Sequence, residues 1–208
     1  MFLKSLIYLS KFLIFIYKNW INILTAIGNI KIFNTPFYIL YDPREYDYKI
    51  RGYQIRHIKS LLKPGDIILR KYDHYLDGFL IPGKYSHSSL YIGNNTIIHA
   101  VAEGVKKIDL IDFCQCDGIC VLRCKNEDIS KQAIINAKLN LGKPYDFKFN
   151  TNDSSEFYCH ELVRTCFKDL NIESYYPSLF NIALKFLDKR YLDKSFLENK
   201  NFNKIIEI

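Results

Sequence analysis

Short hydrophobic runs separated by turn residues dominate the middle of the chain. Their alternation of apolar and polar positions, or their continuous apolar character over a few residues, is typical of β-strands. Gly93-Asn94-Asn95 joins the second run to the third and suits a tight hairpin turn. The pattern predicts a small, largely antiparallel sheet or barrel made from residues 66–71, 86–92, 96–101, 104–110 and 118–124.

Helical periodicity follows the last of these strands. Asn126 or Asp128 can cap a helix that runs to about Leu141, where Gly142 and Pro144 end it. Strands followed by helices of this kind predict an α+β domain, with the sheet packed against helices.

A second helix is predicted from residues 154–156 to about Leu170. Ser178 is suited to cap a further amphipathic segment that ends at Leu187, and residues 57–62 favour a short helix before the sheet. The apolar stripe of the second helix has i, i+3, i+4, i+7 spacing and consists of Cys159, Leu162, Val163, Cys166, Phe167 and Leu170.

The strongly apolar N-terminus is set apart by lysines at every seventh position: Lys4, Lys11 and Lys18. On a helix this spacing places them in one stripe. The uncharged runs between these lysines, such as residues 12–17, are too short to span a bilayer, and no convincing cleavage site marks a signal peptide. We expect residues 1–35 to form an amphipathic helical extension before a main domain at residues 36–208. Such a helix lies on an anionic membrane surface, packs on the domain or a second subunit, or is an uncleaved signal.

The composition is that of a folded protein, with 49% hydrophobic and 25% charged residues. A net charge of +7 favours contact with anionic surfaces or is simply a solvated, lysine-rich exterior. No zinc-finger spacing, RNA-binding strand or basic recognition helix accompanies it, so we expect no nucleic-acid partner. The sequence does not indicate an oligomeric state.

Four of the six cysteines lie close together, at positions 114, 116, 120 and 124. Their C-x-C-x3-C-x3-C spacing lacks paired C-x2-C units, and no histidine lies nearby. Residues 119–124 are better explained as a buried strand that directs Cys120 and Cys124 to one face. We expect reduced thiols, no metal and no cofactor, in a cytoplasmic location or on a membrane that faces a reducing compartment.

Two residues carry candidate chemistry. Cys159 is predicted near the start of its helix, where free N–H groups and the helix dipole favour a thiolate. His87 opens a predicted strand among serines, where an imidazole is able to titrate. A cysteine and a histidine of this kind form a nucleophile and base when a third polar group orients the histidine.

His99 and Glu103 compete for that third position. His99 lies across the predicted hairpin from His87, so the two imidazoles are expected near each other on the sheet. Glu103 would hold an imidazole N–H more strongly because it is charged. We favour His99, with Asn94 a distant third.

Four motifs in this order resemble the YiiX/YebB-like permuted papain amidases, members of an NlpC-type superfamily that includes the lecithin–retinol acyltransferase group. The resemblance covers about residues 60–172. The motifs are residues 65–69 (GDIIL), 85–93 (YSHSSLYIG), 142–146 (GKPYD) and 157–163 (FYCHELV).

The resemblance implies a circularly permuted papain-like fold in which the histidine strand precedes the cysteine helix. It implies Cys159 as nucleophile, His87 as base and the end of the next strand, where His99 stands, as the third position. Many relatives carry Glu there, whereas the acyltransferase group carries His. Tyr145 matches a tyrosine associated with the oxyanion site, or it is an aromatic residue that packs at the turn. His160 replaces the usual Ser after the cysteine.

These observations predict a thiol hydrolase or acyltransferase that acts through a thioester on an amide or ester. An acyl-lipid substrate is favoured because the family is associated with lipid-like substrates and the N-terminus suits a membrane. The alternatives are a cysteine peptidase that cuts a cell-wall peptide and a non-catalytic lipid-binding or membrane-docking module.

Overall fold

The structure, a computed structural model, describes residues 19–20, 22, 26–27, 30–34, 37–41, 48–75, 81, 83–149, 154–175, 178–179, 182–183 and 189–208. Two compact units are present, one of residues 1–45 with 74–77 and the other of residues 46–73 with 78–208. In the first unit, strands β1 (Ile30–Asn34) and β2 (Phe37–Tyr41) form an antiparallel hairpin. The lysine stripe predicted in residues 1–18 lies outside the described residues. No described helix is both long and apolar enough to cross a membrane.

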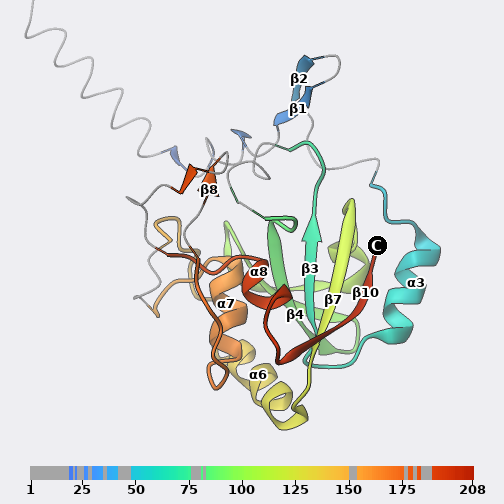
Figure 1. Cartoon of the computed structure of the whole chain (residues 1–208), viewed down its shortest axis with the longest axis vertical. Helices are drawn as coiled ribbons and strands as arrows, with labels where there is room; N and C mark the ends of the chain where they lie inside the picture. The colour runs from blue at the N-terminus through green and yellow to red at the C-terminus, as the bar shows by residue number, and fades with distance from the viewer. Residues whose placement is uncertain are drawn as a thin grey trace, which may run out of the picture. The chain divides into compact units, whose positions relative to one another are not determined.

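The second unit is built around a six-stranded sheet in the order β10-β7-β3-β4-β5-β6, in which every neighbouring pair is antiparallel (Figure 1). The five predicted strands are confirmed within one residue at each end. The prediction missed β10, which pairs with β7 and adds a sixth strand at that edge. The strand bounds are β3 Ile67–Lys71, β4 His87–Gly93, β5 Thr96–Val101, β6 Gly104–Asp109, β7 Gly118–Cys124 and β10 Phe202–Glu207.

The predicted hairpin joins β4 to β5. Asn94 and Asn95 have positive φ angles of 51° and 56°, the conformation that a two-residue turn of this hand requires and that Asn tolerates. The turn fixes a register in which Ser89 lies opposite His99. The hairpin therefore decides which strand positions face each other at the candidate site.

The helices depart from the prediction mainly at their ends. α3 (Gly52–Leu61) starts before the predicted residue 57, and α5 (Leu110–Phe113) replaces the predicted end of a strand. α6 (Glu127–Leu139) begins after Asn126, whose side chain accepts hydrogen bonds from two backbone amides, as expected of a cap. α8 (Lys194–Leu197) precedes β10.

The prediction of an amphipathic helix after Ser178 is wrong for those residues of the segment that the structure describes. These residues form two short antiparallel strands, β8 (Ser178–Leu179) and β9 (Ile182–Ala183). Leu179, Ile182 and Ala183 thus lie in paired strands rather than on a helix.

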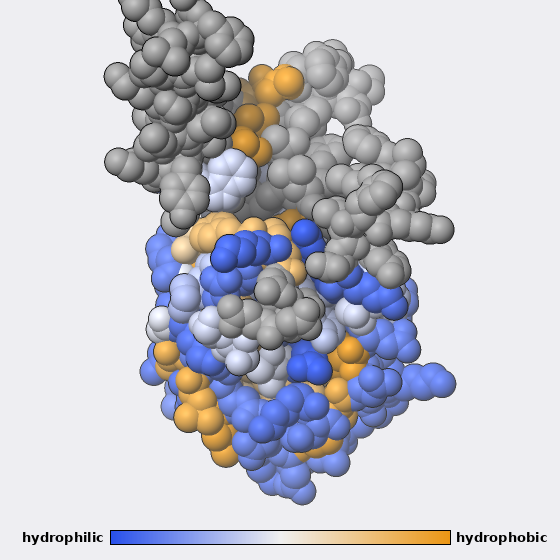
Figure 2. All heavy atoms as spheres, turned by 90° about the vertical axis from the view of Figure 1, so that its left-hand side faces the viewer, coloured by the Kyte–Doolittle hydropathy of each residue, from blue (hydrophilic) through white to orange (hydrophobic). Residues whose placement is uncertain are grey.

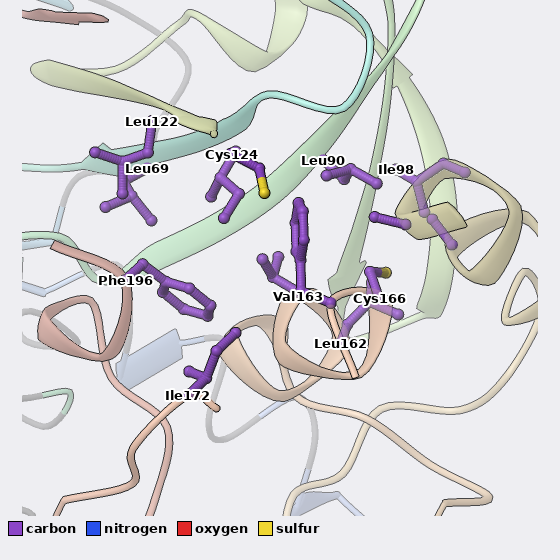
Figure 3. Close-up of a cluster of buried hydrophobic side chains, with 14 of the residues drawn as sticks. Leu69, Leu90, Ile98, Leu122, Cys124, Leu162, Val163, Cys166, Ile172 and Phe196 are labelled. Atoms are coloured by element: carbon purple, nitrogen blue, oxygen red, sulfur yellow. The ribbon is translucent and has the colours of Figure 1, made fainter. Parts of the chain in front are cut away.

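Two hydrophobic cores lie on the two faces of the sheet. The larger is formed with α6 and α7 (Cys159–Cys166), and Figure 3 shows Val163 of α7 facing Leu69 and Leu90 of the sheet. The smaller includes residues of α3 and α5. Cys120 and Cys124 both belong to the larger core, as the alternation predicted. On the face that Figure 2 shows, the described residues are mostly hydrophilic, and hydrophobic residues form separate patches.

Candidate active site

Cys159 is the first residue of α7, and Tyr158 before it has extended backbone angles. The predicted helix start at residues 154–156 is therefore wrong. Phe157 and Tyr158 are buried, and the Phe157 amide donates to the carbonyl oxygen of Pro144 at 3.0 Å. These contacts hold the chain extended until Cys159, so the cysteine stands where backbone N–H groups have no intrahelical acceptor.

The Cys159 sulfur lies against the backbone on both sides of His87. Sγ is 3.8 Å from the Ser86 carbonyl oxygen, and the backbone amide of Ser88 acts on the thiol as a hydrogen-bond donor. Sγ is also 3.3 Å from Nδ1 of His160. The residue is only 2% exposed.

Burial raises the pKa of the Cys159 thiol to about 11, whereas the amides of Ser88, His160 and Cys159 itself lower it. The positive charge of Arg70 lowers it further. The sulfur is thus protonated in this structure, although the donors needed to stabilise a thiolate are already in place. Such a thiol needs a base before it can act as a nucleophile.

His87 and His99 are brought together by the hairpin. Nε2 of His87 lies 3.1 Å from Nδ1 of His99, and the two rings meet edge to face with centroids 5.3 Å apart. His87 is half-buried and His99 is buried, with 2% of its surface exposed. The contact uses Nε2 of His87, so its other ring nitrogen, Nδ1, does not take part in it.

The protonation state of His99 follows from its surroundings. Burial lowers its pKa to about 3, and the charges of Arg70 and Lys106 lower it further against the opposing effect of Glu103. A neutral His99 keeps a lone pair on Nδ1 when its proton is on Nε2. It can then accept the Nε2–H of His87, which leaves a lone pair on Nδ1 of His87.

Glu103 and Tyr145, the other two predicted residues, make side-chain contacts outside the imidazole pair. The Glu103 side chain is 70% exposed and pairs with Lys106 at 2.9 Å, and this pairing lowers its pKa. Tyr145 is half-buried, packs against the larger core and contacts the ring of Phe147 at a centroid distance of 4.8 Å. Its expected role as an oxyanion donor stays a prediction.

Two residues that lie beside the imidazoles of His87 and His99 were not identified from the sequence. Phe113 places its ring 5.8 Å from that of His87 and 5.9 Å from that of His99. Arg70 lies directly opposite His87 in the β3–β4 register and has its guanidinium carbon 4.3 Å from the Phe113 centroid. Because Arg70 comes two positions after Ile68, strand alternation alone predicts that the two side chains lie on the same face of the sheet. Which residue lies beside Arg70 on the next strand depends on the pairing of β3 with β4.

His160 was noted in the sequence only as a departure from Ser. Its ring is 1% exposed, stacks on Phe196 at 6.2 Å, and has a pKa lowered to about 3 by burial. It is therefore neutral, and it is the imidazole that hydrogen-bonds the sulfur in this structure.

A model of the permuted papain-like amidase enzymes, described as the YaeF/YiiX, C92 family, matches residues 61–200. Among solved structures the chain is similar to the crystal structure of the metalloprotein yiiX from Escherichia coli O157:H7. The TM-score is 0.58 at 16% identity, and the match covers 71% of this chain and 98% of that one. No curated protein matches the chain. The α+β fold is thus the permuted papain-like one.

The solved relative is named a metalloprotein, and we tested whether residues of this chain suit a metal. Among the described residues, no group of three or more His, Cys, Asp or Glu side chains is placed to hold an ion. Cys114 and Cys116 lie in the smaller core and Cys120 and Cys124 in the larger one, so the sheet separates the two pairs. We therefore derive no step through a metal.

Proposed function

The chain belongs to the permuted papain-like amidase family, and from this premise we propose that it is a thiol amidase with Cys159 as nucleophile and His87 as base. One observation carries the proposal. The sulfur at the start of α7 lies against the two backbone neighbours of His87, and the His87 imidazole is hydrogen-bonded to a second, neutral imidazole.

The proposed reaction starts with a turn of the Cys159 side chain from His160 toward His87. Nδ1 of His87 takes the thiol proton, and the sulfur attacks the carbonyl carbon of the substrate. The amide of Cys159, at the first position of the helix, donates to the developing oxyanion, and Tyr145 is the expected second donor. One donor of this kind lowers the barrier by about 3 kcal/mol.

Release of the acyl group completes the cycle. The bond from carbonyl carbon to nitrogen breaks as the His87 imidazolium protonates the leaving amine, and a thioester remains on Cys159. Water, deprotonated by His87, attacks the thioester, and the acid leaves as the thiol is restored. An amine or alcohol in place of water gives acyl transfer through the same steps. His99 stays neutral and orients His87 throughout.

We propose an acyl-lipid amide or ester as the substrate class. The net charge of +7 supports contact with an anionic lipid surface, and the lysine-striped N-terminus supports it further. The rival substrate is a cell-wall peptide.

A matched substrate panel tests the proposal. The full chain is incubated with N-acyl amino acids, phospholipids and purified peptidoglycan, and released acid or amine is quantified beside Cys159→Ala. We expect turnover of an acyl-lipid substrate that the variant lacks. Turnover of peptidoglycan alone would assign the chain to the peptidases. Equal turnover by the variant would eliminate Cys159 as the nucleophile.

A further inference from the structure

Arg70 is a cation that has no carboxylate partner among the residues that the structure describes. In the part of the chain that the structure describes, no carboxylate lies within ion-pair distance of it, and its hydrogen bond runs from Nη1 to the Phe113 carbonyl oxygen at 3.1 Å. Its Nε is buried without a hydrogen-bond partner. An unpaired, half-buried cation is costly, so such groups are found where another ligand supplies the missing charge.

The position of Arg70 is fixed by aromatic rings. Its guanidinium carbon lies 4.3 Å from the Phe113 centroid and 5.3 Å from the Tyr72 centroid. These contacts hold the planar group in one place, which reduces the entropy lost when it binds a ligand.

The same contacts place Arg70 beside the imidazole pair. Arg70 and His87 are directly opposite each other on neighbouring strands, so their side chains share one face of the sheet. The Phe113 ring touches Arg70, His87 and His99. The charge of Arg70 also reaches the sulfur, because it lowers the pKa of Cys159 after the larger effects of burial and the neighbouring amides.

Two carboxylates of the same sheet region, Asp66 and Glu103, are paired with other cations. The buried carboxylate of Asp66 pairs with Arg123 at 2.7 Å, and Glu103 pairs with Lys106. Arg70 differs from Arg123 because it lies beside the proposed catalytic imidazoles and, in the described part of the chain, has no such carboxylate.

From this arrangement we propose that Arg70 binds an anionic group of the substrate, so that the enzyme acts on amides or esters that carry a carboxylate or a phosphate near the scissile bond. The inference rests on the proposed function. It adds a specificity-determining residue and a charge requirement to the acyl substrate. Arg is suited to both anions because its fork of N–H donors matches their paired oxygens.

Two alkylating reagents of nearly equal size test the charge requirement without a known substrate. Iodoacetate is anionic and iodoacetamide is neutral, and mass spectrometry of the Cys159 peptide gives the rate of each. The ratio of the two rates, divided by the same ratio for N-acetylcysteine, measures attraction of an anion to the sulfur. Changes in the pKa of the thiol alter both rates equally and cancel in the ratio.

We expect the wild-type chain to favour iodoacetate by about tenfold on this scale, because one nearby charge in a partly buried site has an effect of that order. Arg70→Gln should lose the preference, and Arg70→Lys should retain most of it. Lys131→Gln, which removes a charge from the exposed surface of α6, should leave it unchanged. Circular dichroism identifies variants that fold.

Failure of the inference differs from failure of the proposed function. Fast iodoacetamide labelling of Cys159, with no charge preference or with one that Arg70→Gln retains, overturns the role of Arg70 and leaves the nucleophile. A Cys159 as slow as Cys166 toward both reagents overturns both proposals.

The source of the anion is then separated with substrates. An N-acyl amino acid, its carboxamide and a phospholipid are compared, and loss of Arg70 should raise KM for the anionic member it recognises while the neutral carboxamide is unaffected. Equal effects on the acid and its carboxamide, with no effect on the phospholipid, would contradict anion binding.

Discussion

The two ends of α7 carry two cysteines that are equally buried but differ in their surroundings. Cys159 and Cys166 lie seven residues apart on one helical stripe, and each is 2% exposed. Burial alone acts on Cys166 and raises its pKa to about 12. At Cys159 burial is opposed by three backbone amides and by Arg70, and the pKa is about 11. The comparison teaches that a buried sulfur becomes a candidate nucleophile through the hydrogen-bond donors and the charge around it, not through burial.

Removing each sulfur in turn tests this comparison with the largest expected effect. Cys159→Ala should reduce turnover by at least about 10⁴-fold, because the step that forms the thioester is lost. Cys166→Ala should leave kcat/KM within a few-fold and lower stability, because its sulfur only packs. Steady-state rates and thermal unfolding of both variants give the answer. Equal losses of activity in the two variants would show that Cys159 and Cys166 do not differ in function.

The two imidazoles that we propose to act on Cys159 provide a sharper test of the same difference. His87→Gln should lower kcat by about 10²- to 10⁴-fold as a lost general base. His99→Leu should lower it less, and His99→Asn should restore part of the rate because an amide oxygen can accept the Nε2–H of His87. Rates are measured for each folded variant.

Glu103→Gln is the matched control for the third position. Because this side chain is exposed and pairs with Lys106, we expect kcat to change by less than about threefold. A large loss in this variant, with His99→Leu unaffected, would assign the orienting role to Glu103.

Strands were easier to predict than the site. Residues 96–101 and 118–124 were placed within their true bounds because Asn, Gly and Asp punctuate them. The start of α7 was misplaced because Ser154 and Ser155 look like caps, whereas tertiary contacts of the next residues decide where the helix begins. β10 was missed because its sequence, FNKIIE, has exposed positions on an edge strand and lacks regular alternation.

The pairing of His87 with His99 followed from hairpin geometry alone. The contact of His160 with the sulfur did not, because two consecutive helical residues normally point in different directions and only the rotamers bring their atoms together. The position of Arg70 beside the imidazoles could not be predicted either, because it depends on the pairing of β3 with β4 and not on the local sequence.

A smaller expected effect is a pH dependence of stability from two buried imidazoles, of which His160 lies beside Cys159 at the start of α7. The buried imidazoles His99 and His160 have pKa values near 3 in the fold, below the ordinary 6.5. The unfolded chain binds more protons below pH 6.5, so stability is retained above that pH and decreases as the pH falls toward 3. Between pH 7 and 5.5 we expect the free energy of unfolding to decrease by about 2 kcal/mol from this pair.

Urea unfolding at several pH values measures the slope. His160→Ser should reduce it by about half, whatever its effect on stability at pH 7. His57→Gln is the control, because His57 is exposed, and should leave the slope unchanged. A slope that His160→Ser does not alter would show that this imidazole is not held neutral by burial.

The most direct test of the account is to trap the acyl-enzyme. The full chain is mixed with a p-nitrophenyl fatty acyl ester, quenched in acid, digested with pepsin and mapped by mass spectrometry. The account predicts one acyl group on Cys159, removable by neutral hydroxylamine as a thioester is, and none on Cys166. Acylation elsewhere, or equal acylation of Cys159→Ala, would contradict it.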